Sequence, residues 1–130
     1  MTDVPAATSA RALDHFEASF AFETDCADVH TALVASHSGF VVLDVRSPEF
    51  YAVGHVPGAA NLPSARITER NLAIYPPEML FVVYCAGPHC NGADHAAIRL
   101  ARLGRPVKKM VGGITGWIDE GFDLAGGGGR

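Results

Sequence analysis

The chain has 130 residues, the size of one domain, because two separate cores would each be close to the lower limit for independent folding. Hydrophobic residues make up 48% of it and charged residues 18%, which excludes a chain that is disordered as a whole. The formal net charge of −4 argues against a surface that neutralises phosphates, so we expect no nucleic-acid partner.

No stretch approaches the ~18 to 20 continuous apolar residues of a membrane span, so we expect no membrane partner. The first residues include Asp3 and Pro5 and do not resemble a signal peptide, which favours a cytoplasmic protein. In that setting, an odd number of cysteines, three, predicts free thiols and no disulfide framework.

The N-terminal quarter predicts two helices with a short strand between them. Apolar residues at helical spacing indicate a helix within residues 9–18, and residues 20–23 begin a strand. Asp25 is a suitable cap for a helix over residues 26–36, and Gly39 follows as a stop signal.

Two continuous apolar runs, residues 40–45 and 80–85, predict strands that are buried on both faces of a parallel sheet. Prolines and glycines between these runs divide the chain into a short helix at 48–53, a short strand at 59–62, and loops.

The C-terminal third begins with an amphipathic helix over residues 93–103. Asn91 and Asp94 before it resemble a capping box with a shortened acid. A further strand at 107–111 and a last helix at 115–120 complete a pattern of strands alternating with helices. This pattern predicts an α/β domain with a central, mostly parallel sheet.

The loop after the second buried strand carries the first candidate for chemistry. Cys85 lies where a strand ends, shortly before a helix begins. Unpaired amides and the positive end of the helix dipole favour thiolate over thiol there, and the thiolate is the nucleophilic form. A structural interpretation is also open, in which Cys85 is a small apolar residue that ends a core strand.

Several motifs occur in the order typical of one family. Asp44 and Arg46 form an Asp-x-Arg strand end, and residues 54–63 read Gly-His-Val-Pro-Gly-Ala-Ala-Asn-Leu-Pro. Val-Val-Tyr-Cys ends at Cys85, and residues 112–117 read Gly-Gly-Ile-Thr-Gly-Trp. On these motifs the chain resembles a rhodanese-like domain, which implies a five-stranded sheet flanked by helices and a sulfurtransferase activity.

The resemblance covers residues 25–122 and implies that Cys85 takes a sulfane sulfur as a persulfide and passes it to a thiophilic acceptor. The expected partners are a small sulfur donor and a thiol or protein acceptor of sulfur, with no cofactor. The predicted substrate-binding residues are the rest of the loop and the preceding strand end, namely Ala86, Gly87, Pro88, His89, Cys90, Asn91, Gly92, Asp44 and Arg46.

The loop departs from the family pattern, which places Arg or Lys five residues after the nucleophile. Cys90 occupies that position here, and the loop is about two residues longer than usual. The missing guanidinium removes a bidentate contact with an anionic donor, so we expect thiosulfate to be a poor donor. Three roles remain open for Cys90: a resolving thiol, a second sulfur carrier, or a small loop residue.

Several residues around the loop have a structural interpretation beside a functional one. Asp44 and Arg46 either face the loop or form a structural ion pair, and His89 either assists the thiol or is simply exposed. Gly112 and Gly113 indicate a close approach of backbone segments. The loop's cysteines and histidines lack a usual zinc spacing, so no metal is expected.

The function alternative to an enzyme is a catalytically weak rhodanese-like module that binds a partner or senses oxidation through Cys85 and Cys90. A phosphatase or arsenate reductase is disfavoured, because its loop requires an arginine that this loop lacks. We divide the chain into a partly helical N-terminal extension (1–20), a rhodanese-like domain (21–124) and a flexible glycine-rich tail (125–130).

Overall fold

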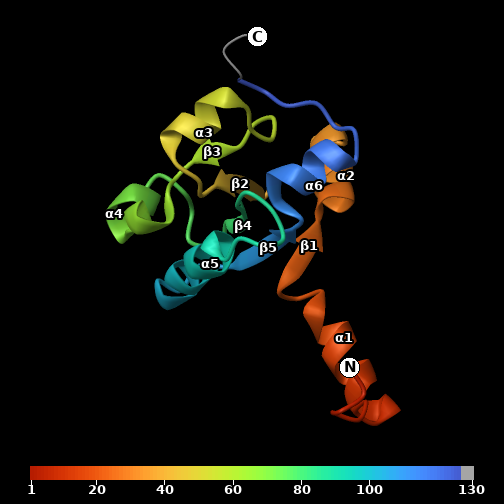
Figure 1. Ribbon diagram of the computed structural model, residues 1–130. Helices are drawn as coiled ribbons and strands as arrows, with labels where there is room; N and C mark the ends of the chain where they lie inside the picture. Colours follow the sequence, from red (N-terminus) through yellow and green to blue (C-terminus); the bar gives the residue numbers. More distant parts are fainter. Residues whose placement is uncertain (127–130) are drawn as a thin grey trace.

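The computed structural model describes residues 1–126; part of the predicted tail, residues 127–130, lies outside the described residues. Strands and helices alternate along most of the chain (Figure 1). In chain order they are α1 (Ser9–Ser19), β1 (Glu23–Asp25), α2 (Cys26–Val34), β2 (Phe40–Asp44), α3 (Pro48–Val53), β3 (Ala60–Asn61), the 3-10 helix η1 (Ser64–Arg66), α4 (Glu69–Leu72), β4 (Leu80–Tyr84), α5 (Gly92–Arg102), β5 (Val107–Val111) and α6 (Gly113–Asp119).

The strands form a five-stranded sheet in the order β1-β5-β4-β2-β3, and neighbouring strands in it are parallel. β2 and β4 pair from Phe40 opposite Leu80 to Asp44 opposite Tyr84. These two strands are the continuous apolar runs of the sequence, and each is flanked by another strand on both sides. The predicted α/β fold with a mostly parallel five-stranded sheet is confirmed.

Helices cover both faces of the sheet, and alternate residues of β4 point to opposite faces. Val82 and Tyr84 pack in a core with residues of α2 and α6. Phe81, Val83 and Cys85 pack in a second core with residues of α4 and α5. Each fully buried apolar side chain contributes about 1.5–3 kcal/mol to folding. Adjacent residues at the end of β4 therefore serve two different cores.

The N-terminal extension contains helix α1, which projects away from the sheet (Figure 1). The Thr8 side chain caps the helix by accepting a hydrogen bond from the backbone N–H of Arg11. No residue of α1 is buried, and its apolar residues Leu13 and Phe16 are exposed. The helix is capped locally and contributes no residue to either core. Within the described residues, no helix is long and apolar enough to cross a membrane.

The capping box predicted before α5 is wrong. Asn91 stands at the cap position, but its side chain makes no capping hydrogen bond. The Asp94 carboxylate instead accepts a hydrogen bond from Lys109 Nζ at 2.9 Å, on the neighbouring strand β5. An ammonium donor from β5 has taken the place of the backbone N–H in satisfying this carboxylate.

The chain end returns to the domain at Ala125, which we predicted to lie in the tail. The Ala125 N–H donates to the His55 carbonyl at 2.8 Å, and the His55 N–H donates back at 3.0 Å. This antiparallel pair connects residues after α6 to the loop after α3.

Candidate functional site

Cys85 directly follows β4 and lies against the first turn of α5. Its residue is 9% exposed. A Cβ added at Gly92, the first residue of α5, would come within 2.7 Å of Cys85 Sγ. The thiol therefore lies beside a helix N-terminus, as the sequence predicts. The unpaired amides and dipole of this helix end favour negative charge on the sulfur.

The base of the loop is held by α6. The backbone N–H of Ile114 donates to the Cys85 carbonyl, and that of Thr115 donates to the Ala86 carbonyl, both at 3.0 Å. Gly113 makes this approach possible: its φ is +61°, and a Cβ there would lie 2.5 Å from the Cys85 carbonyl oxygen. The close backbone approach predicted for the Gly-Gly pair is confirmed at this glycine.

Cys85 and Cys90 form a disulfide, so the prediction of free thiols is wrong for this pair. Their Cα atoms are 6.5 Å apart, because the loop turns back on itself as the Cys90 N–H donates to the Gly87 carbonyl. The Gly92 N–H also points to Cys90 Sγ, at 3.4 Å. The expectation rested on the number of cysteines, which carries no information about how close two of them lie within one loop. Cys26 is free and buried.

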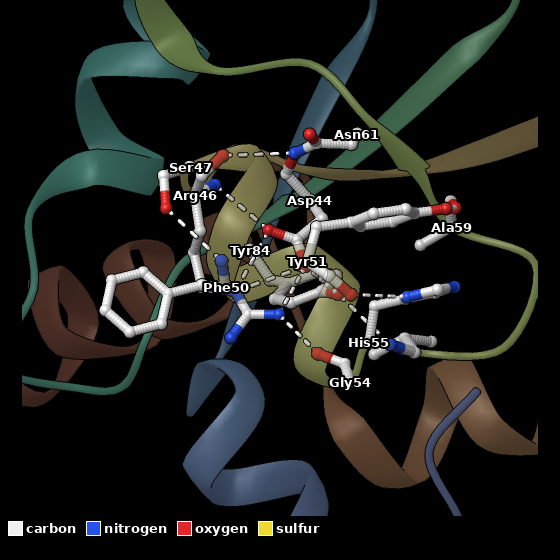
Figure 2. Close-up of polar contacts among 11 residues, drawn as sticks. Asp44, Arg46, Ser47, Phe50, Tyr51, Gly54, His55, Ala59, Asn61 and Tyr84 are labelled. Carbon is white, nitrogen blue, oxygen red and sulfur yellow. Dashed lines mark hydrogen bonds and ion pairs between the residues drawn. The ribbon is translucent and has the colours of Figure 1, made fainter. Parts of the chain in front are cut away.

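Asp44 and Arg46 form an ion pair at the end of β2 (Figure 2). The Asp44 carboxylate is buried and accepts from Arg46 Nη2 at 2.7 Å, from Arg46 Nε, and from the Arg46 backbone N–H. The hydroxyl of Tyr84 donates to the same carboxylate at 2.5 Å and accepts from the Val56 N–H at 3.1 Å. Four donors therefore hold this charge in the core.

The ion pair also organises the turn that follows it. Arg46 Nη2 donates to the Gly54 carbonyl at 2.7 Å, at the end of α3. Asn61 Nδ2 donates to the carbonyls of both Asp44 and Arg46 at 3.0 Å, from β3 (Figure 2). Of the two interpretations left open for the pair, these contacts fit the structural one.

Burial and neighbouring charges shift the pKa values of several groups near this end of the sheet. Burial, together with the hydrogen bond to Asp44, raises the pKa of Tyr84 far above its ordinary value, so the phenol stays protonated. Burial acts to lower the pKa of Arg46, but the hydrogen bonds and charge of Asp44 outweigh it, and the pKa rises. Burial, with nearby carboxylates, raises the pKa of Cys26 to about 11.

A cavity of about 430 Å³ opens beside the disulfide. Ser47 caps α3 through the Phe50 N–H, and that helix places Phe50 in the cavity wall. The walls are mostly apolar, and the Arg46 guanidinium that reaches them is engaged by Asp44 and Gly54. The lining residues are Arg46, Ser47, Phe50, Cys85, Ala86, Cys90, Ile114 and Thr115.

The predicted substrate-binding residues are distributed over several surfaces. Arg46, Ala86 and Cys90 line the larger cavity, whereas Gly87 and Pro88 line a smaller one of about 80 Å³ near Lys109. Neither set of lining residues includes His89 or Asn91. The remaining two predicted residues have other positions. Asp44 is buried in the ion pair, and Gly92 lies directly beside the sulfur atoms of Cys85 and Cys90.

Sequence reasoning missed Tyr84, Phe50 and Thr115. Strand alternation in the sequence indicates only that Tyr84 lies on the face opposite to Cys85; its register with Asp44 comes from the structure. Among the described residues, no three histidine, cysteine or acidic side chains gather closely enough to hold a metal ion.

The chain is 40% identical over 87 residues to an HTH-type transcriptional regulator of Mycobacterium tuberculosis, which covers 62% of this chain and 38% of the regulator. It is 34% identical over 89 residues to the thiosulfate sulfurtransferase GlpE of Pseudomonas entomophila, over 66% of this chain and 77% of that enzyme. The chain thus spans well under half of the regulator's length.

Solved structures and family models agree with the architecture. The BH2092 protein of Bacillus halodurans superposes with a TM-score of 0.87 at 36% identity, over 89% of this chain and 85% of that one. The family model described as a rhodanese-like domain matches residues 28–120, which include both central strands, the Cys85 loop and α6. The chain belongs to the rhodanese-like domain family.

Proposed function

We propose that this chain is a sulfurtransferase in which Cys85 accepts a sulfane sulfur, carries it as a persulfide, and passes it to a thiophilic acceptor. The observation that carries the proposal is the position of Cys85 Sγ, between the first residue of α5 and the 430 Å³ cavity. The similarity to a thiosulfate sulfurtransferase supports the same class of reaction.

The reaction starts from the reduced loop, because a disulfide leaves no nucleophile. The Cys85 thiolate attacks the outer sulfur of the donor, the donor's sulfur–sulfur bond breaks, and the donor leaves with the bonding electron pair. The new persulfide is anionic and lies beside the amides at the start of α5. A thiol acceptor then takes the outer sulfur and regenerates the Cys85 thiolate.

The cavity favours a donor with little charge. Phe50, Ala86 and Ile114 present apolar surface beside the sulfur, and the Arg46 guanidinium is engaged by Asp44 and the Gly54 carbonyl. The guanidinium among these lining residues already has its charge paired with the Asp44 carboxylate, which weakens its attraction for an anionic donor. Donors that carry less charge on sulfur than the thiosulfate dianion, such as persulfides and organic polysulfides, are therefore better candidates.

A second candidate is a module with little transferase activity that senses oxidation through Cys85 and Cys90. The disulfide between these residues favours it, and so does the similarity to a transcriptional regulator. The two candidates differ in turnover: a transferase consumes many equivalents of donor and acceptor, whereas a sensor reacts once per chain.

The test is sulfur transfer by the reduced protein and by two matched variants. Cys85→Ser should abolish persulfide formation and turnover while the fold is kept, because serine is nearly isosteric but a poor nucleophile without a base. Cys90→Ser should gain about 32 Da after incubation with donor, located on Cys85 by peptide mapping. Normal turnover in Cys85→Ser would refute the assignment of Cys85 as sulfur carrier.

A further inference from the structure

We propose that Cys90 is a resolving thiol that converts the Cys85 persulfide into free hydrosulfide, so that the loop reduces sulfane sulfur within one chain. This inference rests on the proposed function, because it starts from the persulfide. It adds a product, hydrosulfide, and an internal electron source to sulfur transfer.

The loop in this structure brings Cys85 and Cys90 close enough to be joined as a disulfide. The disulfide joins them across five positions of sequence, with the Cα atoms 6.5 Å apart. Both cysteines line the same 430 Å³ cavity. No large movement of the chain is therefore needed for Cys90 Sγ to reach Cys85 Sγ.

The backbone of Gly92 lies close to the sulfur atoms of both Cys85 and Cys90. A Cβ on Gly92 would lie 2.7 Å from Cys85 Sγ and 3.4 Å from Cys90 Sγ, and its N–H points to Cys90 Sγ. The start of α5 thus stabilises negative charge on either sulfur, on the attacking Cys90 as well as on Cys85.

The proposed step is an attack of the Cys90 thiolate on the Cys85 persulfide. The Cys90 thiolate attacks Sγ of Cys85 in its Cys85–S–SH form, and the bond between Sγ and the outer sulfur breaks. The outer sulfur leaves as HS⁻ with the bonding electrons, and the Cys85–Cys90 disulfide forms. Cys90 is oxidised and the outer sulfur is reduced; an external dithiol must then reduce the disulfide before another round.

Cys26 does not fit this role. Its residue is 4% exposed, and its thiol points to the carbonyls of Val111 and Gly113 at 3.6 Å. It packs in the core of the opposite sheet face from Cys85. Cys26→Ser is therefore a matched control that removes a thiol without touching the loop pair.

The experiment is a single turnover on reduced, desalted protein without oxygen or added thiol. Thiosulfate and cysteine persulfide are each tested as donor, and the donor that loads Cys90→Ser is used for all variants. Thiosulfate is informative because its other product, sulfite, is not a thiol. Intact mass and released sulfide are recorded over time for wild type, Cys26→Ser, Cys85→Ser and Cys90→Ser.

Wild type and Cys26→Ser should lose about 2 Da as the disulfide forms and release about one equivalent of sulfide per chain. Cys90→Ser should keep its gain of about 32 Da and release at least tenfold less sulfide. A wild-type persulfide as long-lived as that of Cys90→Ser would overturn the inference and leave the proposed function intact. Failure of Cys90→Ser to gain sulfur from either donor would overturn both.

Discussion

The backbone of Gly92 lies against the sulfur of Cys85, so closely that a single added methyl group at Gly92 would come within 2.7 Å of Sγ. The glycine is the first residue of α5, where an alanine would otherwise favour the helix by up to about 1 kcal/mol. Its absence of a side chain makes room for the thiol.

Gly92→Ala should therefore lower the rate of persulfide formation at Cys85 by at least about tenfold, because the methyl group displaces the sulfur from the helix end. The rate of the gain of about 32 Da in a Cys90→Ser background measures this. Gly104→Ala is the control at the other end of α5: a Cβ there meets no neighbour, although its φ of +75° strains an alanine by about 1 kcal/mol. Equal rates in the two variants would contradict the steric role of Gly92.

Removal of the Tyr84 hydroxyl should destabilise the domain. Tyr84→Phe takes one donor from the buried Asp44 carboxylate and the acceptor from the Val56 N–H, which predicts a loss of about 2–4 kcal/mol in the free energy of unfolding. Tyr51→Phe is the matched control. It removes one hydrogen bond, to the Ala59 carbonyl at 2.6 Å, from a partly exposed tyrosine, and should cost about 1 kcal/mol.

Urea denaturation of both variants measures the difference. Equal losses for Tyr84→Phe and Tyr51→Phe would show that the buried carboxylate does not depend on the Tyr84 hydroxyl.

Alkylation of Cys26 should be slow and strongly pH-dependent. Its pKa of about 11 leaves about one thiolate in a thousand at pH 8, so its rate should rise about tenfold per pH unit up to pH 10. The folded pKa is higher than that of the unfolded chain, so this group's stabilising contribution is present below the ordinary thiol pKa and is lost as the pH rises toward 11.

Mass spectrometry of the folded, reduced Cys85→Ser, Cys90→Ser double variant isolates the alkylation of Cys26. A plateau in its rate near pH 9 would contradict a raised pKa. In Cys26→Ser the corresponding alkaline loss of stability should be smaller.

Thiosulfate should be a weak donor. With Cys90 at the position where the family has Arg or Lys, a charge-assisted contact of about 1.5–3 kcal/mol is missing, or roughly ten- to hundredfold in binding. The comparison is kcat/KM for thiosulfate and for a small persulfide with the same acceptor. Cys90→Arg should improve the use of thiosulfate when the new side chain points toward Cys85. A high kcat/KM for thiosulfate in wild type would contradict the prediction, because it would show that the loop amides alone are enough to bind the anion.

The framework of the site could be predicted from the sequence, because the spacing of apolar residues along the chain indicates strands and helices. The apolar runs 40–45 and 80–85 predicted two buried strands of a parallel sheet, whose carboxyl ends lie at one edge. The helix after the loop also followed from its spacing. Each of these features depends on residues that are close together in the chain.

Features that depend on contacts between distant segments were not predicted. The Tyr84 hydroxyl finds Asp44 only through the register of β4 with β2, and the Asp94 carboxylate finds Lys109 only after β5 has packed beside α5. The Cys85–Cys90 disulfide depends on how tightly the six-residue turn from Cys85 to Cys90 closes. Composition and periodicity contain no information about such distances.

The loop after Cys85 is anchored at both of its ends by neighbouring helices. Amides of Ile114 and Thr115 hold the carbonyls of Cys85 and Ala86, and α5 begins at Gly92. The anchors therefore determine where the sulfur of Cys85 lies, and the residues between them determine which groups surround it.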